Sequence, residues 1–259
     1  MSGNVLLLHL NNDSNYGEND TYVYDFSGNG NDGTGINLNG DEVTGSGKLN
    51  GAIEFDGVDD CINLGGNVSG DSLDLSVFTI SAWINYDAPN PSGASIVAKR
   101  DTSGYQYQFR VSANNLNLLT TGGSVTDTTD LSANKWYHVV ASRDGSNVKF
   151  YVNGKLSSSP ASKSISYVDS SAYVGCDLQG GVPELRFNGT IDEIAIWNRS
   201  ISSEEVLDIY KRGSLKLNLS VQSCDDASCS GESFTNLGNN LNSPQNLSIS
   251  NNQYFQYNF

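Results

Sequence analysis

The feature that most constrains the fold is a succession of short strand-like runs along most of the chain. In each run, β-branched or aromatic residues alternate with polar ones, and Gly, Asn, Asp and Ser cluster between the runs. Strands do not alternate with long helices, as a parallel α/β sheet would require. The pattern predicts an all-β fold of antiparallel strands in two packed sheets, because each strand has one apolar side. The expected strands are residues 5–10, 52–55, 61–64, 78–86, 95–100, 106–112, 115–120, 136–143, 147–152, 172–175 and 189–198.

Two turns carry specific predictions. In FDGVDD, Asp56 and Gly57 are expected to form a tight hairpin between Phe55 and Ile62, with Gly adopting the positive φ that such a turn needs. The Asn-Gly pair at 153–154 is expected to form a second hairpin of the same kind.

One segment, SISSEEVLDIYKRG, has the pattern of a helix instead. Ser202 is expected to cap it, Glu205 to complete a capping box, and Gly213 to end it. The helix should therefore be short and lie on the sandwich. Its expected apolar stripe is Val206, Leu207 and Tyr210.

The length and composition indicate one large domain followed by a smaller segment. A chain of 259 residues with 37% hydrophobic content has enough apolar residues for one substantial core. After Gly213 the sequence becomes rich in Asn and Ser. We expect one sandwich over residues 1–213, and residues 214–259 to be either the start of a second β module or extra strands docked on the first.

The charge of the chain excludes several classes of partner. A net charge of -15 and a pI near 4.3 disfavour nucleic acids and anionic membrane surfaces, because the protein's field repels polyanions. No apolar run reaches the roughly 18 residues that a membrane helix needs, so no direct membrane insertion is expected. Calcium, neutral sugars and basic protein surfaces remain compatible partners.

The cysteines predict one local disulfide. Cys224 and Cys229 enclose only DDAS, a spacing that a disulfide closes and that does not match a zinc ribbon. Cys61 and Cys176 each lie in a strand-like run, and they pair only if those strands are neighbours. Sequons such as NGT at Asn188 also favour an extracellular context.

Six segments, in this order, resemble the laminin G-like group of the concanavalin A-like lectin and glucanase superfamily. The resemblance covers roughly residues 1–213 and implies a jelly roll of two antiparallel sheets, which agrees with the strand pattern. It also implies a secreted or cell-surface location. The segments are YDFSGNGNDGT (24–34), GAIEFDGVDDCINLG (51–65), FTISAWIN (78–85), KWYHVVASRDGSNVKFYVNGK (135–155), AYVG (172–175) and FNGTIDEIAIWNRSISSEEVLDIY (187–210).

The carboxylates Asp192 and Glu193 superficially resemble the catalytic strand of glucanases with this fold. Those enzymes need a second carboxylate on the same face, about 5 Å from the first in a retaining mechanism. Aligning Glu193 with the first catalytic glutamate places Ala195, Trp197 and Asn198 where the other acidic residues belong. We therefore expect that the chain is not an enzyme.

The resemblance implies a structural calcium ion that ties the DFSGNGNDG loop to the IDE strand. Calcium prefers six to eight oxygen ligands. The candidate ligands are Asp25, Asn31, Asp32 and Asp192. The alternative is that Asp25 and Asp32 only stabilise turns by accepting backbone N–H bonds.

Long loops provide a second candidate site. Tyr105, Tyr107 and Arg186 lie in or beside loops that are longer than hairpins require, and they offer the aromatic and charged groups of a saccharide site. Trp197, at the end of its strand, fits either the core or this role. The alternative is that these loops bind no ligand.

Together these observations predict a non-catalytic carbohydrate-binding or adhesion module, calcium-stabilised, in a larger secreted or cell-surface protein. Its expected partner is a glycan or a cell-surface protein, and we expect a monomer within a multidomain chain. The alternative is a structural or protein-binding spacer. A glycoside hydrolase of the glucanase fold is the third hypothesis, which the missing carboxylate pair disfavours.

Overall fold

The computed structural model describes residues 2–39, 43–44, 47–65, 70–87, 93–101, 104–179, 182–214, 218–224, 226–229, 233, 235–239 and 254–258. The chain divides into two compact units, Met1–Gly213 and Ser214–Phe259. Within the described residues, no helix has the length and apolar character of a membrane span.

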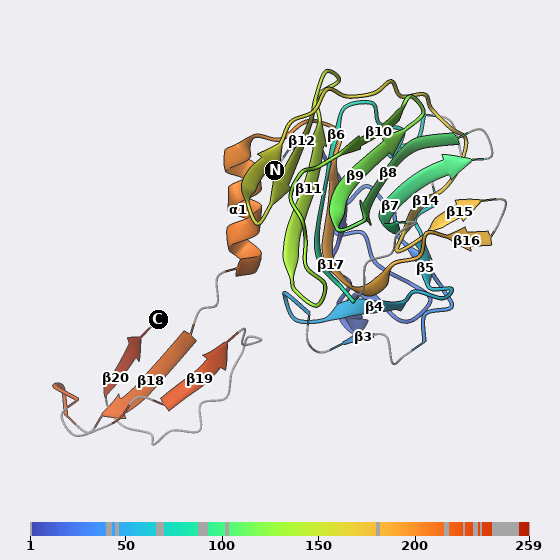
Figure 1. The fold of residues 1–259 in the computed structure, drawn as a ribbon. Helices are drawn as coiled ribbons and strands as arrows, with labels where there is room; N and C mark the ends of the chain where they lie inside the picture. The colour runs from blue at the N-terminus through green and yellow to red at the C-terminus, as the bar shows by residue number, and fades with distance from the viewer. Residues whose placement is uncertain are drawn as a thin grey trace. The chain divides into compact units, whose positions relative to one another are not determined.

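The first unit is a sandwich of two antiparallel sheets, which confirms the predicted fold class (Figure 1). β1 (Asn4–Leu8) belongs to the eight-stranded sheet and pairs with β17. In spatial order, the other strands of this sheet are β13 (Lys155–Ser158), β12 (Val148–Val152), β11 (Tyr137–Arg143), β6 (Phe78–Tyr86), β17 (Asn188–Trp197), β4 (Ala52–Asp56) and β3 (Val43–Thr44). The second sheet has seven strands, β10 (Gly123–Thr126), β9 (Asn115–Thr120), β8 (Gly104–Ser112), β7 (Ala94–Asp101), β14 (Ala172–Val174), β5 (Cys61–Asn63) and β2 (Thr34–Ile36). A separate hairpin joins β15 (Asp177–Gln179) to β16 (Val182–Glu184).

The apolar side of each strand faces the space between the sheets. Phe55, Phe78, Phe109, Phe150 and Phe187 are fully buried there, with Leu, Ile and Val from both sheets around them. Removing this apolar surface from water is the main contribution to the stability of such a sandwich.

The predicted hairpin at Asp56 and Gly57 is wrong in its pairing. Gly57 does adopt a positive φ of 74°, and the Asp56 carboxylate accepts the N–H of Val58. However, β4 and β5 lie in different sheets, so the turn carries the chain across the sandwich. A tight turn followed by an alternating run does not specify which sheet the second strand joins. The 153–154 hairpin is confirmed, because Val152 pairs with Lys155.

The predicted helix is confirmed as α1 (Ser203–Ser214), but Gly213, the expected end, lies inside it and is buried. Ser202 Oγ accepts the Glu205 N–H at 3.2 Å, and Glu205 Oε2 accepts the Ser202 N–H at 2.9 Å, which completes the capping box. Val206 packs against the outer face of the eight-stranded sheet, whereas Leu207 is 37% exposed and lies outside the expected stripe.

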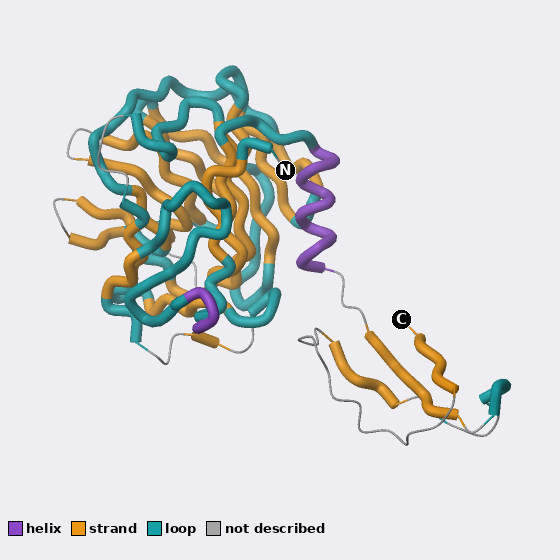
Figure 2. The backbone as a smooth tube through the Cα atoms, turned by 180° about the vertical axis from the view of Figure 1, so that it is seen from behind, coloured by secondary structure: helices purple, strands orange, loops and turns teal. Residues whose placement is uncertain are grey.

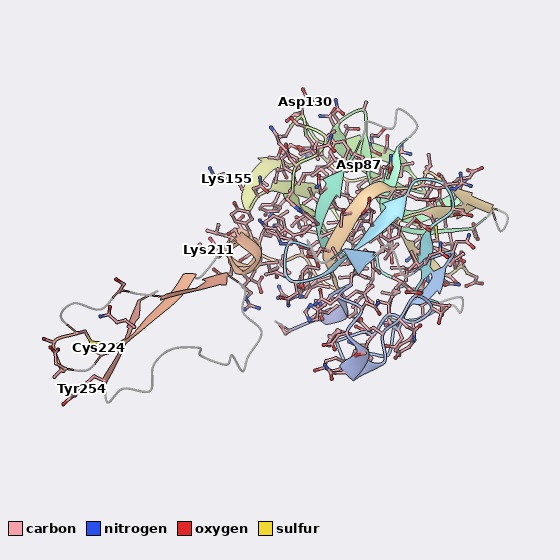
Figure 3. All side chains as sticks on the ribbon, turned by 90° about the horizontal axis from the view of Figure 1, so that it is seen from below. Asp87, Asp130, Lys155, Lys211, Cys224 and Tyr254 are labelled. Atoms are coloured by element: carbon pink, nitrogen blue, oxygen red, sulfur yellow. A yellow bond between two sulfur atoms is a disulfide. The ribbon has the colours of Figure 1, made fainter. Side chains whose placement is uncertain are left out.

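Both cysteine pairs form disulfides. Cys61 bonds Cys176 where β5 and β14 are neighbours. The predicted Cys224–Cys229 disulfide is confirmed in the second unit (Figure 3). That unit contains a three-stranded sheet in the order β19 (Thr235–Asn239), β18 (Asn218–Cys224), β20 (Tyr254–Asn258).

Gly175 provides a test of how closely the two sheets pack. It has φ +77°, and a Cβ at this position would lie 2.1 Å from the Phe55 ring. Gly175→Ala should therefore lower the free energy of unfolding in two ways. Overpacking should cost about 1–3 kcal/mol, and the left-handed backbone should cost roughly 1–2 kcal/mol more. Gly28→Ala is the matched control, because Gly28 has φ +81° and nothing within 4 Å of the added Cβ. Chemical denaturation measures both costs, and equal values would show that the contact with Phe55 is not restrictive.

Candidate functional site

A groove of about 820 Å³ lies on the outer face of the eight-stranded sheet, beside α1. Its floor includes Leu7 of β1 with Ala195 and Trp197 of β17. On the α1 side it is lined by Ile209 and Arg212. The groove is therefore built from segments that are far apart in the sequence.

Aromatic residues of the N-terminal segment also line the groove. Tyr16 ends a short 3-10 helix, η1 (Ser14–Tyr16), which is the short purple coil within the loops of Figure 2. The Tyr16 ring lies 4.7 Å from Phe26 and 5.4 Å from Tyr24, and His9 lies 4.4 Å from Phe26, between ring centroids. Tyr16 remains 50% exposed, so it presents a supported aromatic surface to solvent.

Buried Glu18 holds this segment in place. Its Oε2 accepts the N–H of Asp13 at 2.7 Å and its Oε1 accepts the N–H of Tyr24 at 3.1 Å. The backbone before and after η1, at Asp13 and at Tyr24, is thus bonded to the same carboxylate. Such charge-assisted bonds are stronger than neutral ones, so the position of Tyr16 is well determined.

A β-bulge in β17 places a carboxylate in the groove. One edge of β17 pairs with β4 at residues 188–191 and with β1 at 194–197. The register against β6 shifts between Asp192 and Ala195, and Glu193 has φ +51°. Bulges often occur beside functional sites, where they redirect a side chain.

Glu193 hydrogen-bonds His9 across the groove floor. His9 Nδ1 lies 2.7 Å from Glu193 Oε1, and the two side chains are 32% and 17% exposed. The hydrogen bond to Glu193 raises the pKa of His9 above its ordinary value of 6.5, and this outweighs the effect of burial.

Asp192, the neighbouring carboxylate, is fully buried and does not line the groove. Its Oδ2 accepts the Leu49 N–H at 2.9 Å, whereas its Oδ1 has no hydrogen-bond partner among the residues that the structure describes. Burial raises the pKa of Asp192 to about 8, so the carboxyl is mostly protonated at pH 7.

The other expected calcium ligands form a hydrogen-bonded loop. Asp25 Oδ1 accepts the N–H groups of Leu7 and Ser27, and Oδ2 accepts from Ser27 Oγ and the Asn31 N–H, at 2.8–3.0 Å. Asp32 Oδ1 accepts the Asp25 N–H at 2.8 Å. Protein donors thus bind every Asp25 oxygen, as the turn alternative expected.

The remaining expected ligands also have protein partners. Asn31 Oδ1 accepts from Ser72 Oγ at 2.8 Å, and Asp192 Oδ2 is bonded to Leu49. Among the described His, Cys, Asp and Glu residues, only the turn carboxylates Asp56, Asp59 and Asp60 bring three ligand atoms within 4.8 Å of one another. Among the described residues, protein donors thus already bind both carboxylate oxygens of Asp25, and calcium binding stays a prediction.

The loop candidates lie in different environments. Tyr105 of β8 is half-buried under Arg100, whose guanidinium carbon lies 4.4 Å from the ring centroid. Burial raises the pKa of Tyr105 to about 12. Arg100 also bonds Asp177 at 2.8 Å, and Arg186 is half-buried just before β17. Tyr105 and Arg186 therefore stay candidates for polar contacts with a saccharide.

The other two candidates differ in their access to the groove. Tyr107 is fully buried in the core, where its hydroxyl donates to the Leu73 carbonyl at 3.1 Å, so it has no surface to offer a ligand. Trp197 is 4% exposed and packs under α1 while contributing to the groove floor. Sequence reasoning missed His9, Tyr16 and Phe26, although the aromatic residues at 16–26 were an available signal.

Two antiparallel sheets stacked face to face define an antiparallel β-sandwich module. The model of the Laminin_G_3 family, described as the concanavalin A-like lectin/glucanases superfamily, matches residues 56–207. This match covers more than half of the chain, so the protein belongs to that family.

Solved structures share the fold at low sequence identity. Domain 4 of AbnA, a GH43 extracellular arabinanase from Geobacillus stearothermophilus, in complex with arabinotriose, is 17% identical, with a TM-score of 0.60 over 80% of this chain and 98% of that one. The binding domain of Paraclostridial Mosquitocidal Protein 1 is 15% identical, with a TM-score of 0.61 over 87% and 62%. Trypanosoma rangeli sialidase is 14% identical, with a TM-score of 0.58 over 83% of this chain and 33% of the sialidase. No curated protein matches the sequence.

The two histidines allow a direct test of the His9–Glu193 pair. His9 should titrate above pH 6.5 in NMR spectra, whereas burial lowers the pKa of His138 to about 3. Because the folded pKa of His9 is raised, its stabilisation is complete below pH 6.5 and is lost as the pH rises through the folded pKa. Glu193→Gln should return the His9 pKa towards 6.5. It should also lower the free energy of unfolding by at most about 1 kcal/mol at pH 5.5, and by less at pH 9. An unchanged His9 pKa in the variant would contradict the pairing.

Proposed function

We propose that the protein is a non-catalytic carbohydrate-binding module of a larger secreted or cell-surface protein. The observation that carries the proposal is the groove beside α1, which combines an exposed aromatic ring with a polar pair. Its 820 Å³ volume falls in the range of about 300–1,000 Å³ that is typical of small-ligand sites.

The groove has the two kinds of group that a sugar requires. The face of a sugar ring carries C–H groups that pack on an aromatic ring, and Tyr16 is held in place for such a contact by Tyr24 and Phe26. The sugar hydroxyls need donors and acceptors, which His9 and Glu193 provide.

A binding role is better supported than hydrolysis. Asp192 and Glu193 have different environments, as in an acid and base pair, and this favours glycoside hydrolysis as a second candidate function. However, Asp192 is fully buried, so it has no surface from which to protonate a glycosidic oxygen. Glu193 Oε1 is hydrogen-bonded to His9, and the neighbouring carboxylate, Asp192, does not line the groove.

The fold relatives support the proposal without fixing the ligand. One is a domain solved in complex with arabinotriose, and another is a binding domain. Disulfides in both units are consistent with an oxidising, extracellular setting. A glycan on a cell surface or in a matrix is the proposed partner, and the module is proposed to act as a monomer within its chain. The alternative of a spacer requires no ligand in the groove.

Replacing Tyr16 tests the function. If the groove binds glycans through this ring, Tyr16→Ala should weaken binding about threefold to tenfold, the value of an aromatic contact of roughly 0.5–1.5 kcal/mol. Tyr167→Ala is the matched control, because Tyr167 is 59% exposed and does not line the groove. A broad glycan array followed by titration calorimetry measures both variants and the parent protein.

The outcomes separate the hypotheses. Binding that Tyr16→Ala weakens and Tyr167→Ala does not would support the groove. An array without any binding to demonstrably folded protein would favour the spacer and end the carbohydrate proposal. Release of reducing sugar from a bound oligosaccharide, lost in Asp192→Asn, would favour the hydrolase.

Calcium stabilisation is tested separately by thermal unfolding with calcium and with excess chelator. Calcium at a hundred times its dissociation constant would add about 2.7 kcal/mol, which should raise the unfolding midpoint by several degrees. Asp192→Asn should abolish that rise if Asp192 is a ligand. Each variant is compared with itself under the two conditions, because the substitution also alters the baseline stability. A midpoint that chelator leaves unchanged would end the calcium prediction.

A further inference from the structure

We propose that the groove selects uncharged saccharides by contacting two neighbouring hydroxyl groups through His9 and Glu193. This inference rests on the carbohydrate-binding function proposed above. It adds the class of ligand and the two residues that determine it.

The His9–Glu193 pair leaves one atom on each side chain for a ligand. The bond joins His9 Nδ1 to Glu193 Oε1 at 2.7 Å. Within the described part of the chain, His9 Nε2 and Glu193 Oε2 have no hydrogen-bond partner. Both side chains line the groove and are partly exposed, at 32% and 17%. A ligand in the groove therefore meets two polar atoms that are linked and fixed relative to each other.

Adjacent hydroxyls fit these two atoms in chemical terms. A carboxylate oxygen only accepts hydrogen bonds, whereas a hydroxyl both donates and accepts. One hydroxyl donates to Glu193 Oε2. Its neighbour donates to His9 Nε2 when the imidazole is neutral and accepts from it when the imidazole is protonated. The match therefore holds in both protonation states of His9.

The backbone fixes Glu193 before a ligand arrives. Glu193 lies in the β-bulge with φ +51°, between strand residues that pair with β4 and with β1. The ring of His9 is packed against Phe26 at 4.4 Å between centroids. Groups held in place in this way lose little conformational entropy on binding, so they discriminate well between ligands.

The charges of the groove disfavour acidic sugars. Glu193 is only 17% exposed and therefore poorly screened, and Asp13 also lines the groove. Three groups can oppose this charge. Protonated His9 is already paired with Glu193, Lys48 lies 4.5 Å from the ring centroid of Trp83 at the groove, and Arg212 on α1 is exposed and screened by solvent. A carboxylate or sulfate on the sugar would lie near the Glu193 carboxylate, and the net charge of -15 adds to the repulsion.

The experiment uses the whole 259-residue chain on an array of neutral, uronate-bearing, sialylated and sulfated glycans. Neutral glycans that bind are then titrated by calorimetry, beside their uronate counterparts and their permethylated forms. The variants are Glu193→Gln, which keeps the side-chain size but removes the charge, and His9→Phe, which keeps the ring against Phe26. Glu54→Gln is the control, because Glu54 is exposed in the same sheet and does not line the groove.

We expect binding of neutral glycans, at least tenfold weaker binding of their uronate counterparts, and loss of binding on permethylation. Glu193→Gln and His9→Phe should each weaken neutral binding at least tenfold, whereas Glu54→Gln should not. If Glu193→Gln does not fold, His9→Phe and the permethylated glycans decide the result. Acidic glycans that bind as tightly as neutral ones would overturn the inference.

The remaining outcomes separate this inference from the function on which it rests. Binding that Tyr16→Ala weakens, but Glu193→Gln and His9→Phe leave unchanged, would overturn the two selecting residues and leave the carbohydrate function standing. No binding to folded protein anywhere on the array would end both.

Discussion

The structure depends on one shared strand edge. β17 pairs along one side with β6, while its other side pairs first with β4 and then with β1. Two strands from distant parts of the chain thus meet on a single edge, and the register shift between Asp192 and Ala195 lies where one partner replaces the other. Apolar side chains that face the core fix the strand register at each end of β17. The difference between the two registers is therefore taken up at this point by a bulge. The bulge is therefore a consequence of the topology, and it places Glu193 in the groove.

The outer face of the sheet shows how the groove arises. α1 covers Ala195 and Trp197 at one end of β17, and the aromatic segment around Tyr16 lies on the other side of the groove. The capping box and buried Glu18 hold the two covers in place through local hydrogen bonds, so the groove does not need a ligand to form. A preformed groove costs little ordering entropy on binding.

The fold followed from local patterns, whereas the site did not. Strand alternation, the Asn-Gly turn and the capping box at Ser202 are signals within a few residues, and the structure confirms them. The turn at Gly57 misled because sheet membership is decided by long-range pairing. Tyr107 alternates with Phe109 in β8, and that period-two pattern was the available sign that it faces the core. Contact between residues 9 and 193 depends on β1 joining β17, which no local pattern encodes.

The two adjacent carboxylates, Asp192 and Glu193, differ in burial. Asp192 lies beneath Leu49 without exposed surface, so its proton is favoured and its charge is suppressed at neutral pH. Glu193 reaches the groove, where its Oε1 is hydrogen-bonded to His9 and its Oε2 is left for a ligand. Two residues with the same functional group thus differ in burial at the point where the strand edge changes its pairing from β4 to β1. That separation suits an acid and base pair only if both groups reach the substrate. With one of the two buried, a single fixed acceptor beside an aromatic surface supports recognition better than hydrolysis.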